Sequence, residues 1–451
     1  MVDHGSSTES TAPGASVLAR TQGRLARFRT YPVLGTLTRM IGVTAECRGL
    51  DAELGELCVI SRRNGAAVAA EAIGFRDGST VLMPLADLDG VRPGDAVRAI
   101  GRQLLAPGGD ELLGRVLDGI GRPLDGKPGF LRPYSYPVHR AAPSPSERHA
   151  ILEPCVTGVR ALDGALTLGR GQRIGIFAGA GVGKSTLLAA LSTRSNADVT
   201  VIGLVGERGR EVYDFVRDSM GPEGMKKAVV VAAPSDAPPL QRLKAPYVAT
   251  AIAESFQQQG KHVLLVMDSI TRFAAAAREV GLALGEPPTA KGYPPSLFSH
   301  LPRLVERPGN FARGSITAIY TVLVEGDDLN DPVADSVRSL LDGHVVLARS
   351  LAERGHFPAI DVLASVSRLM PHLVKPEHMG LAAKMRRLLA LYRDHKDLID
   401  VGAYKAGADK AVDEAIKRIP AIEAFLRQDL SKPSQLAETL KGLEQAIGGA
   451  A

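Results

Sequence analysis

Tryptophan is absent from this sequence of 451 residues, aromatic residues make up only 4% of it, and it contains three cysteines. The scarcity of aromatic rings argues against a surface on which nucleic-acid bases stack, so we expect no nucleic-acid partner. Cys47, Cys58 and Cys155 lie far apart and lack the spacing of metal ligands. We therefore predict small buried or half-buried residues in a reducing compartment, rather than metal ligands.

Long apolar runs are missing as well. No segment approaches the length of a membrane span, and residues 1–23 lack the apolar core of a signal peptide. These absences predict a cytoplasmic protein. The contents of 45% apolar and 23% charged residues are those of an ordinary globular protein. A net charge of +5 permits an acidic partner or a membrane surface without demonstrating either.

What the chain does contain is a phosphate-binding pattern. An apolar strand predicted over residues 174–177 runs into a glycine-rich loop, which is followed by Lys184, Ser185 and an apolar helical start. In this context backbone N–H groups turn toward phosphate oxygens, the lysine reaches the β- and γ-phosphates, and the serine hydroxyl binds Mg²⁺. Ala178 stands where the pattern has its first glycine, which is the smallest possible departure. The residues predicted to bind a nucleoside triphosphate are Gly179, Ala180, Gly181, Val182, Gly183, Lys184, Ser185 and Thr186.

Acidic side chains follow two other apolar strands. Asp268 ends one of them, where its carboxylate could hold Mg²⁺ directly or through water. Glu207 comes just after the other and could polarise a water molecule that attacks the nucleotide. A surface glutamate paired with Arg208 or Arg210 explains the same residues equally well. The chemistry of the sequence alone leaves these two interpretations of Glu207 open.

Two residues farther along could complete a nucleotide site. Arg368 ends another predicted strand, and a guanidinium reaching across a subunit boundary could neutralise charge that develops on the γ-phosphoryl group. A structural ion pair is the simpler explanation of this arginine. Phe357 could stack on an adenine ring, or it could belong to the core.

Strand and helix patterns divide the chain into four parts. Residues 1–22 predict a flexible tail, followed by basic residues whose role is either docking or solvation, and residues 23–101 predict a small β-barrel with hairpin signals at 64–65 and 77–78. Strands alternate with helices within residues 102–370, which predicts an α/β core with a parallel sheet, and residues 371–451 predict a helical domain. Barrel strands are expected within 35–44, 57–60, 66–73 and 80–83, core strands at 199–205, 228–232, 263–267 and 315–323, and helices at 381–392 and 412–422; the basic residues are Arg20, Arg24, Arg27 and Arg29.

Taken together, these motifs resemble the catalytic core of the rotary ATPases. The likeness is carried by the phosphate loop, the strand that ends at Asp268, and the segments 206–211 and 365–368. Further segments are similar to the ATPases that energise type III protein export, in the bacterial flagellum and in the related injectisome. These segments are 268–273, 285–295, 314–318, 323–328, 338–344 and 356–361. The resemblance as a whole covers nearly all of the chain after about residue 23.

The resemblance implies a RecA-like ATPase core at residues 102–370 and a ring of six identical subunits with Mg-ATP at each interface. It makes Glu207 the catalytic carboxylate, assisted by Lys184, and Arg368 the arginine finger that a neighbouring subunit supplies. Arg208 matches a position close to the γ-phosphate. Phe357 falls where the family has an adenine-stacking aromatic residue, usually tyrosine.

By the same resemblance, the N-terminal segment meets a regulatory, stator-like partner that holds the ATPase near the export gate at the inner membrane. The C-terminal domain meets export substrates and their chaperones. Residues 398–409 look like the flagellar version, whereas 55–58 and 239–244 look more like the injectisome version; we favour the flagellar assignment.

Two alternatives come from other classes of protein. A hexameric RNA-translocating helicase would share the core and the ring, but it needs a nucleic-acid-binding barrel, and the barrel region here is poor in aromatic residues. A structural, non-catalytic ring subunit would lack the carboxylate at residue 207.

Overall fold

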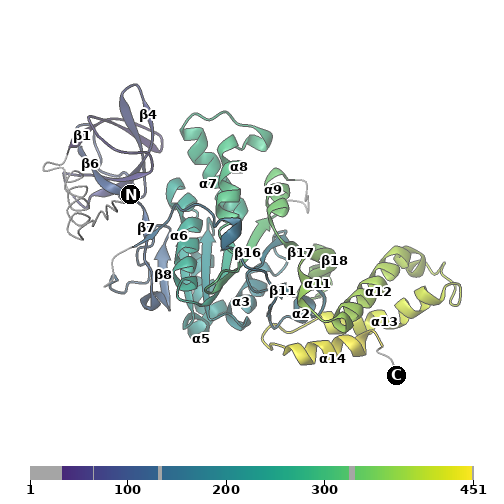
Figure 1. The fold of residues 1–451 in the computed structure, drawn as a ribbon. Helices are drawn as coiled ribbons and strands as arrows, with labels where there is room; N and C mark the ends of the chain where they lie inside the picture. Colours follow the sequence, from purple (N-terminus) through teal and green to yellow (C-terminus); the bar gives the residue numbers. More distant parts are fainter. Residues whose placement is uncertain (1–32, 64, 131–134, 325–330, 449–451) are drawn as a thin grey trace, which may run out of the picture. The chain divides into compact units, whose positions relative to one another are not determined.

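A computed structural model describes residues 33–63, 65–130, 135–324 and 331–448 (Figure 1). Its described residues form two compact units: one runs to Leu82 and also contains 88–101, and the other contains 83–87 and the chain from Arg102 onward. The basic segment that holds Arg20, Arg24, Arg27 and Arg29 lies outside the described residues, as do residues 325–328 of one segment that carried the family resemblance.

The N-terminal unit is a closed six-stranded barrel, as predicted. Its strands follow the order β1-β2-β5-β4-β3-β6, and the run expected at 35–44 is split by a turn at residues 42–43. Asp77 and Gly78 both have positive φ, 49° and 72°, as a tight turn between β4 and β5 requires. Residue 64 of the other hairpin signal lies outside the described residues. The strands are β1 (Leu34–Ile41), β2 (Thr44–Arg48), β3 (Glu56–Ile60), β4 (Val68–Arg76), β5 (Ser79–Pro84) and β6 (Ala96–Gln103).

The second unit is built on an eight-stranded sheet of order β18-β17-β12-β16-β15-β13-β14-β8. Its central strands are buried on both faces, which explains why they read as continuous apolar runs in the sequence. The predicted parallel sheet needs one correction, because β18 pairs antiparallel with β17. The strands are β8 (Arg115–Asp118), β12 (Arg173–Ala178), β13 (Val199–Val205), β14 (Ala228–Ala233), β15 (His262–Asp268), β16 (Ser315–Leu323), β17 (Gly343–Leu347) and β18 (Ile360–Ser367).

Helices and short strand pairs complete this unit. Two-stranded pairs are formed by β7 (Leu105–Ala106) with β9 (Tyr136–Pro137) and by β10 (Pro154–Cys155) with β11 (Leu168–Gly169). The helices that precede the C-terminal region are α2 (Arg160–Ala165), α3 (Lys184–Arg194), α4 (Gly209–Asp214), a π-helical segment (Phe215–Met220), α5 (Gly221–Met225), α6 (Pro239–Gln257), α7 (Ile270–Ala283), α8 (Pro295–Val305), α9 (Pro332–Leu340) and α10 (Arg349–Glu353).

After β18 the described chain is helical, as predicted. It contains α11 (Met370–Leu373), α12 (Pro376–Asp400), α13 (Lys410–Leu426) and α14 (Leu436–Ala446). Met385, Ile422 and Phe425 of these helices belong to the same hydrophobic core as Leu187 of α3. The C-terminal helices pack mainly against α2, and α12 also packs against β18.

Two further observations concern the described part of the chain. None of its helices combines the length and the apolar character that crossing a membrane takes. The three cysteines are buried and free, as the sequence predicted for their burial.

A buried ion pair joins α6 to the end of α8. The Arg307 side chain is 0% exposed; its Nε and Nη2 donate to the two carboxylate oxygens of Glu254, both at 2.8 Å, and its Nη1 donates to the Val138 carbonyl at 2.7 Å. Removing one partner of such a pair leaves an uncompensated charge in the interior.

We therefore expect Arg307→Ala to destabilise this unit by about 3–5 kcal/mol. The measurement is the shift in the denaturant midpoint relative to the unchanged chain. Lys226→Ala is the control, because Lys226 pairs with Glu223 on the surface and exposed pairs contribute only about 0–1 kcal/mol. A loss no larger than that of the control would mean that the pair does not hold these helices.

Candidate active site

The glycine-rich loop lies between the carboxyl end of β12 and the start of α3. Gly181 and Gly183 have φ of 79° and 85°, the left-handed region that favours glycine, and Gly183 caps α3. The N–H groups of the first turn of α3 are therefore directed into the loop, where the helix N-terminus favours an anion. Ala178 is the buried last residue of β12, and its carbonyl accepts a hydrogen bond from Val324 N at 3.1 Å, so the strand ladder continues to the start of the loop.

Three predicted residues meet beside this loop. Lys184 Nζ forms an ion pair with Asp268 Oδ1 and lies 3.8 Å from Glu207 Oε1. The two acids reach the lysine because β13 and β15 are parallel neighbours that end at the same edge, with Leu204 opposite Asp268. All three side chains are largely buried. Glu207 is thus part of a buried cluster and is not a surface glutamate.

Two residues that the sequence did not single out individually support the cluster. Thr321 Oγ1, from the neighbouring strand β16, donates to Asp268 Oδ1 at 2.6 Å and fixes the orientation of that carboxylate. The Arg272 side chain of α7 lies against Gly206, where a Cβ atom would come within 2.9 Å of Arg272 Cβ. The sequence feature that could have identified Thr321 is a hydroxyl side chain within a strand that is otherwise largely apolar and is buried up to its last residue.

The electrostatics of the cluster set the proton affinity of Glu207. Burial raises the pKa of Glu207 from 4.5 to about 7; the negative charge of Asp268 also raises it, and the positive charge of Lys184 opposes the shift. A carboxyl group that titrates near neutral pH is matched to proton transfer at that pH.

The raised pKa predicts a pH-dependent stability of the nucleotide-free chain. Between the unfolded value of 4.5 and the folded value of about 7, the folded state holds a proton that the unfolded state has lost. This contribution of Glu207 to stability is therefore present at about pH 4.5 and below, and it is lost as the pH rises to about 7.

Glu207→Gln removes this titration, so we expect the variant to gain stability relative to the unchanged chain as the pH rises from about 5 to about 8. Thermal unfolding midpoints across this range provide the measurement. The exposed acid Glu223, changed to Gln, is the control and should follow the unchanged chain. Parallel profiles for the Glu207 variant and the unchanged chain would contradict the assignment.

The remaining predicted residues are distributed around the loop. Ser185 and Thr186 are exposed at the start of α3. The Phe357 ring is 42% exposed and lies beside the loop, because a Cβ atom on Gly183 would be 3.3 Å from two of its ring carbons. The Arg208 side chain is 84% exposed and pairs with Glu211 at 3.7 Å, so the structure does not bring it into the Lys184 cluster.

Arg368 lies at the amino end of the parallel strands, whereas the glycine-rich loop lies at their carboxyl end. Arg368 follows β18, which runs antiparallel to β17, so Ser367 pairs with Gly343 at the amino end of the parallel strands. The Arg368 N–H donates to the Asp342 carbonyl at 3.0 Å, level with the start of β12. The loop begins after the other end of β12, about 16 Å farther along that strand. An arginine side chain of the same chain cannot span this distance.

Comparison with known proteins agrees with this architecture. Residues 158–367 match the nucleotide-binding domain of the ATP synthase alpha/beta family, residues 37–101 match its beta-barrel domain, and residues 374–445 match the T3SS EscN ATPase C-terminal domain. The structure is similar to that of the assembled ATPase EscN from the enteropathogenic E. coli type III secretion system, with a TM-score of 0.87 and 44% identity, covering 92% of this chain and 100% of that one.

Relatives of both export systems have similar identity to this chain. The flagellum-specific ATP synthase of Pseudomonas aeruginosa is 50% identical over 422 residues, which cover 92% of this chain and 94% of the relative. The type 3 secretion system ATPase of Xanthomonas euvesicatoria is 47% identical over 427 residues, which cover 94% and 96%.

The fold, the glycine-rich loop and these matches define a nucleotide-binding enzyme, and the chain belongs to the ATP synthase alpha/beta family. Because the relatives match over nearly the whole length, including the C-terminal domain, the particular protein is a type III export ATPase. The helicase and the non-catalytic subunit are thereby set aside.

Proposed function

We propose that this export ATPase hydrolyses Mg-ATP at the interfaces of a ring of six identical copies, and that it serves flagellar assembly. The observation that carries the proposal is the separation of the phosphate loop from Arg368 across the sheet. Each chain offers a nearly complete nucleotide site at the carboxyl end of the parallel strands and an exposed arginine, Arg368, at their amino end. A neighbouring copy can therefore supply what each site lacks. The similarity to EscN, whose structure is that of an assembled ATPase, supports such a ring.

In this proposal Lys184 exchanges its carboxylate partners for the β- and γ-phosphates of ATP. The backbone N–H groups of residues 179–186 bind the phosphate oxygens, and Phe357 stacks on the adenine. The Ser185 hydroxyl and the Asp268 carboxylate fit Mg²⁺, a hard cation that prefers oxygen ligands, because both lie beside the loop and Thr321 fixes the carboxylate. When bound, the ion neutralises phosphate charge.

Glu207 orients the attacking water and accepts its proton, for which a pKa near 7 is suited. Arg368 of the adjacent copy stabilises the negative charge that develops on the transferred phosphoryl group. Arg208, which the resemblance places close to the γ-phosphate, is exposed in the single chain.

The partners are proposed from the resemblance and from one relative. EscN has been solved in complex with its central stalk EscO, and an equivalent stalk is expected to pass through the ring formed by this chain. The N-terminal segment would bind a regulatory partner that keeps the ATPase at the inner-membrane export gate. The C-terminal helices would meet export substrates and chaperones, and their shared core with α3 gives them a mechanical link to the nucleotide.

The flagellar assignment rests on residues 398–409, which join α12 to α13. Tyr404 holds this connection in place, since its hydroxyl donates to Asp413 Oδ1 at 2.9 Å and to the Asp409 carbonyl at 3.0 Å. The injectisome remains the alternative. Deleting the gene should abolish motility; a strain that stays motile but loses injectisome secretion would reverse the assignment.

The activity itself is tested by Mg-ATP turnover per subunit, measured over a range of protein concentrations with and without single-stranded RNA. We expect specific activity to rise with concentration and to be indifferent to RNA, since the site is completed by a second copy. A flat response would mean that one chain holds a complete site and that Arg368 has no role in it. Turnover that depended on RNA would contradict this expectation.

A further inference from the structure

The backbone at Arg368 is held by the first residue of β12. The Arg368 N–H donates to the Asp342 carbonyl at 3.0 Å. The Asp342 carboxylate in turn accepts the Arg173 N–H at 3.0 Å and two guanidinium hydrogen bonds, from Nε and Nη2, both at 3.2 Å. The Asp342 N–H donates back to the Arg173 carbonyl at 2.9 Å. A bidentate pair with backbone bonds in both directions fixes geometry as well as charge.

The residue before Arg173, Gln172, contacts the backbone of Asp342 and the side chain of Ser367, which precedes Arg368. Gln172 is fully buried, and its amide Nε2 donates to the Asp342 carbonyl at 3.2 Å and to Ser367 Oγ at 3.3 Å. Ser367 Oγ donates to the Thr167 carbonyl at 2.8 Å. Both the peptide N–H of Arg368 and the residue before it are therefore tied to the start of β12.

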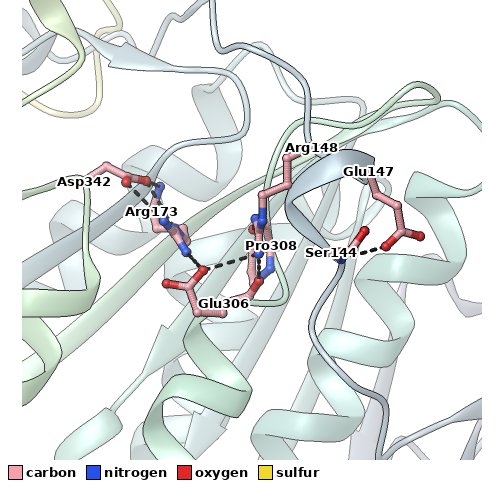
Figure 2. A network of polar contacts seen from close by, with 7 residues as sticks. All are labelled: Ser144, Glu147, Arg148, Arg173, Glu306, Pro308 and Asp342. Atoms are coloured by element: carbon pink, nitrogen blue, oxygen red, sulfur yellow. Dashed lines mark hydrogen bonds and ion pairs between the residues drawn. The ribbon is translucent and has the colours of Figure 1, made fainter.

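A second carboxylate holds the Arg173 guanidinium from its other side (Figure 2). Arg173 Nη1 pairs with Glu306, and Arg148 Nη2 lies 3.3 Å from the same carboxylate oxygen of Glu306. Arg148 Nη1 also donates to the Pro308 carbonyl at 3.1 Å. The Arg173 side chain is only 15% exposed, so this network is shielded from the screening that weakens surface ion pairs.

The backbones of β17 and β18 approach each other closely just before Arg368. Gly343 follows Asp342 and has φ of 156°, and a Cβ atom there would lie 2.3 Å from the Val366 carbonyl oxygen. The two strands therefore approach each other closely at this point, and a displacement of Asp342 is passed directly to the end of β18.

We propose that Arg173, acting through Asp342, is a positioning residue for Arg368 and fixes the strand end from which the arginine reaches the neighbouring nucleotide. The inference rests on the proposed function, because it needs Arg368 to act in another copy. The same strand, β12, carries the phosphate loop at its carboxyl end and Arg173 at its amino end. Strand β12 thus connects the nucleotide site of a chain with Arg368, which would act in the site of the neighbouring copy.

Arg173→Gln and Asp342→Asn test the proposal in the full-length chain. We expect kcat to fall about 10- to 100-fold, because a catalytic group displaced by about 1 Å can cost a factor of that order. The KM for ATP and the binding of a fluorescent ATP analogue should change less than about two-fold, since the phosphate loop is untouched. Arg173→Lys keeps one contact and should recover part of kcat.

Arg170→Gln is the matched control, since Arg170 lies at the same edge of the sheet and pairs with Glu153 at 2.7 Å. It should leave kcat unchanged. Thermal unfolding of each variant shows whether the fold is kept. An increase in KM with unchanged kcat, or weakened binding of the analogue, would overturn the proposal by placing the effect of Arg173 in its own nucleotide site.

Rings assembled from two variants distinguish an effect of Arg173 on the neighbouring nucleotide site from an effect on the site of its own chain. Arg173→Gln subunits have an intact nucleotide site, whereas Glu207→Gln subunits have an intact finger. In a randomly mixed ring roughly a quarter of the interfaces combine the two intact halves, so turnover should rise well above that of either variant alone. The mixture of Arg368→Ala with Glu207→Gln is run in parallel.

The two mixtures distinguish the possible failures. Recovery with Arg368→Ala but not with Arg173→Gln would contradict the positioning role and leave the proposed interface site intact. Recovery with neither would contradict the interface site itself.

Discussion

Replacing Glu207 by glutamine should lower ATP turnover about 10³-fold while the chain continues to bind nucleotide. The amide keeps the size of the side chain but cannot accept a proton from water at neutral pH. Lys184, the glycine-rich loop and Asp268 are unchanged by the substitution, and these are the groups expected to hold the phosphates and the metal. Steady-state turnover and titration with a fluorescent ATP analogue measure the two properties separately.

Two controls make this result specific. Glu223→Gln removes an exposed acid and should leave turnover unchanged. Asp268→Asn, in contrast, should weaken Mg²⁺-dependent binding as well as turnover, because it alters the carboxylate that Thr321 orients. If the Glu207 variant kept its turnover, the proton acceptor would have to be another group.

Arg368→Ala has the second large expected effect: nucleotide binding survives, and hydrolysis falls about 10³-fold or more. The reason is the distance between Arg368 and the phosphate loop of its own chain, which leaves the arginine no part in holding that nucleotide. Its loss removes charge stabilisation only in the transition state at the neighbouring site.

The decisive measurement is the comparison of binding with turnover at a protein concentration where rings form. Arg368→Lys keeps the charge but loses the forked geometry, so a partial recovery of turnover is expected. Full activity of the alanine variant would show that the finger lies elsewhere. Weakened binding with unchanged kcat would show that Arg368 acts on its own chain.

Much of the fold could be predicted because buried parallel strands have a simple signature. The runs at 199–205 and 315–323 coincide with β13 and β16 residue for residue, since strands covered on both faces are apolar throughout. The direction of β18 could not be predicted, because it depends on where the preceding chain turns. The addition of β8 at the far edge had no local signal either.

In the site, too, residues that belong to a local sequence pattern could be predicted, whereas residues whose partners are distant in the sequence could not. The spacing of the phosphate loop and the acid at the end of β15 predicted Lys184 and Asp268, which the structure brings together. Thr321 and Arg173 were missed because their partners are distant in sequence and each is an ordinary residue at the position it occupies. Arg208 was selected by resemblance, and its environment in the single chain is solvent.

The antiparallel course of β18 also determines how copies of this chain can meet. In the proposed ring, the surface that would receive an arginine and the surface that would give one are different, so the two neighbours of a copy are not equivalent. Head-to-tail association through such a contact either closes into a ring or continues as a filament. A closed ring built in this way is polar around its circumference: every copy presents its arginine edge to one neighbour and its phosphate-loop edge to the other.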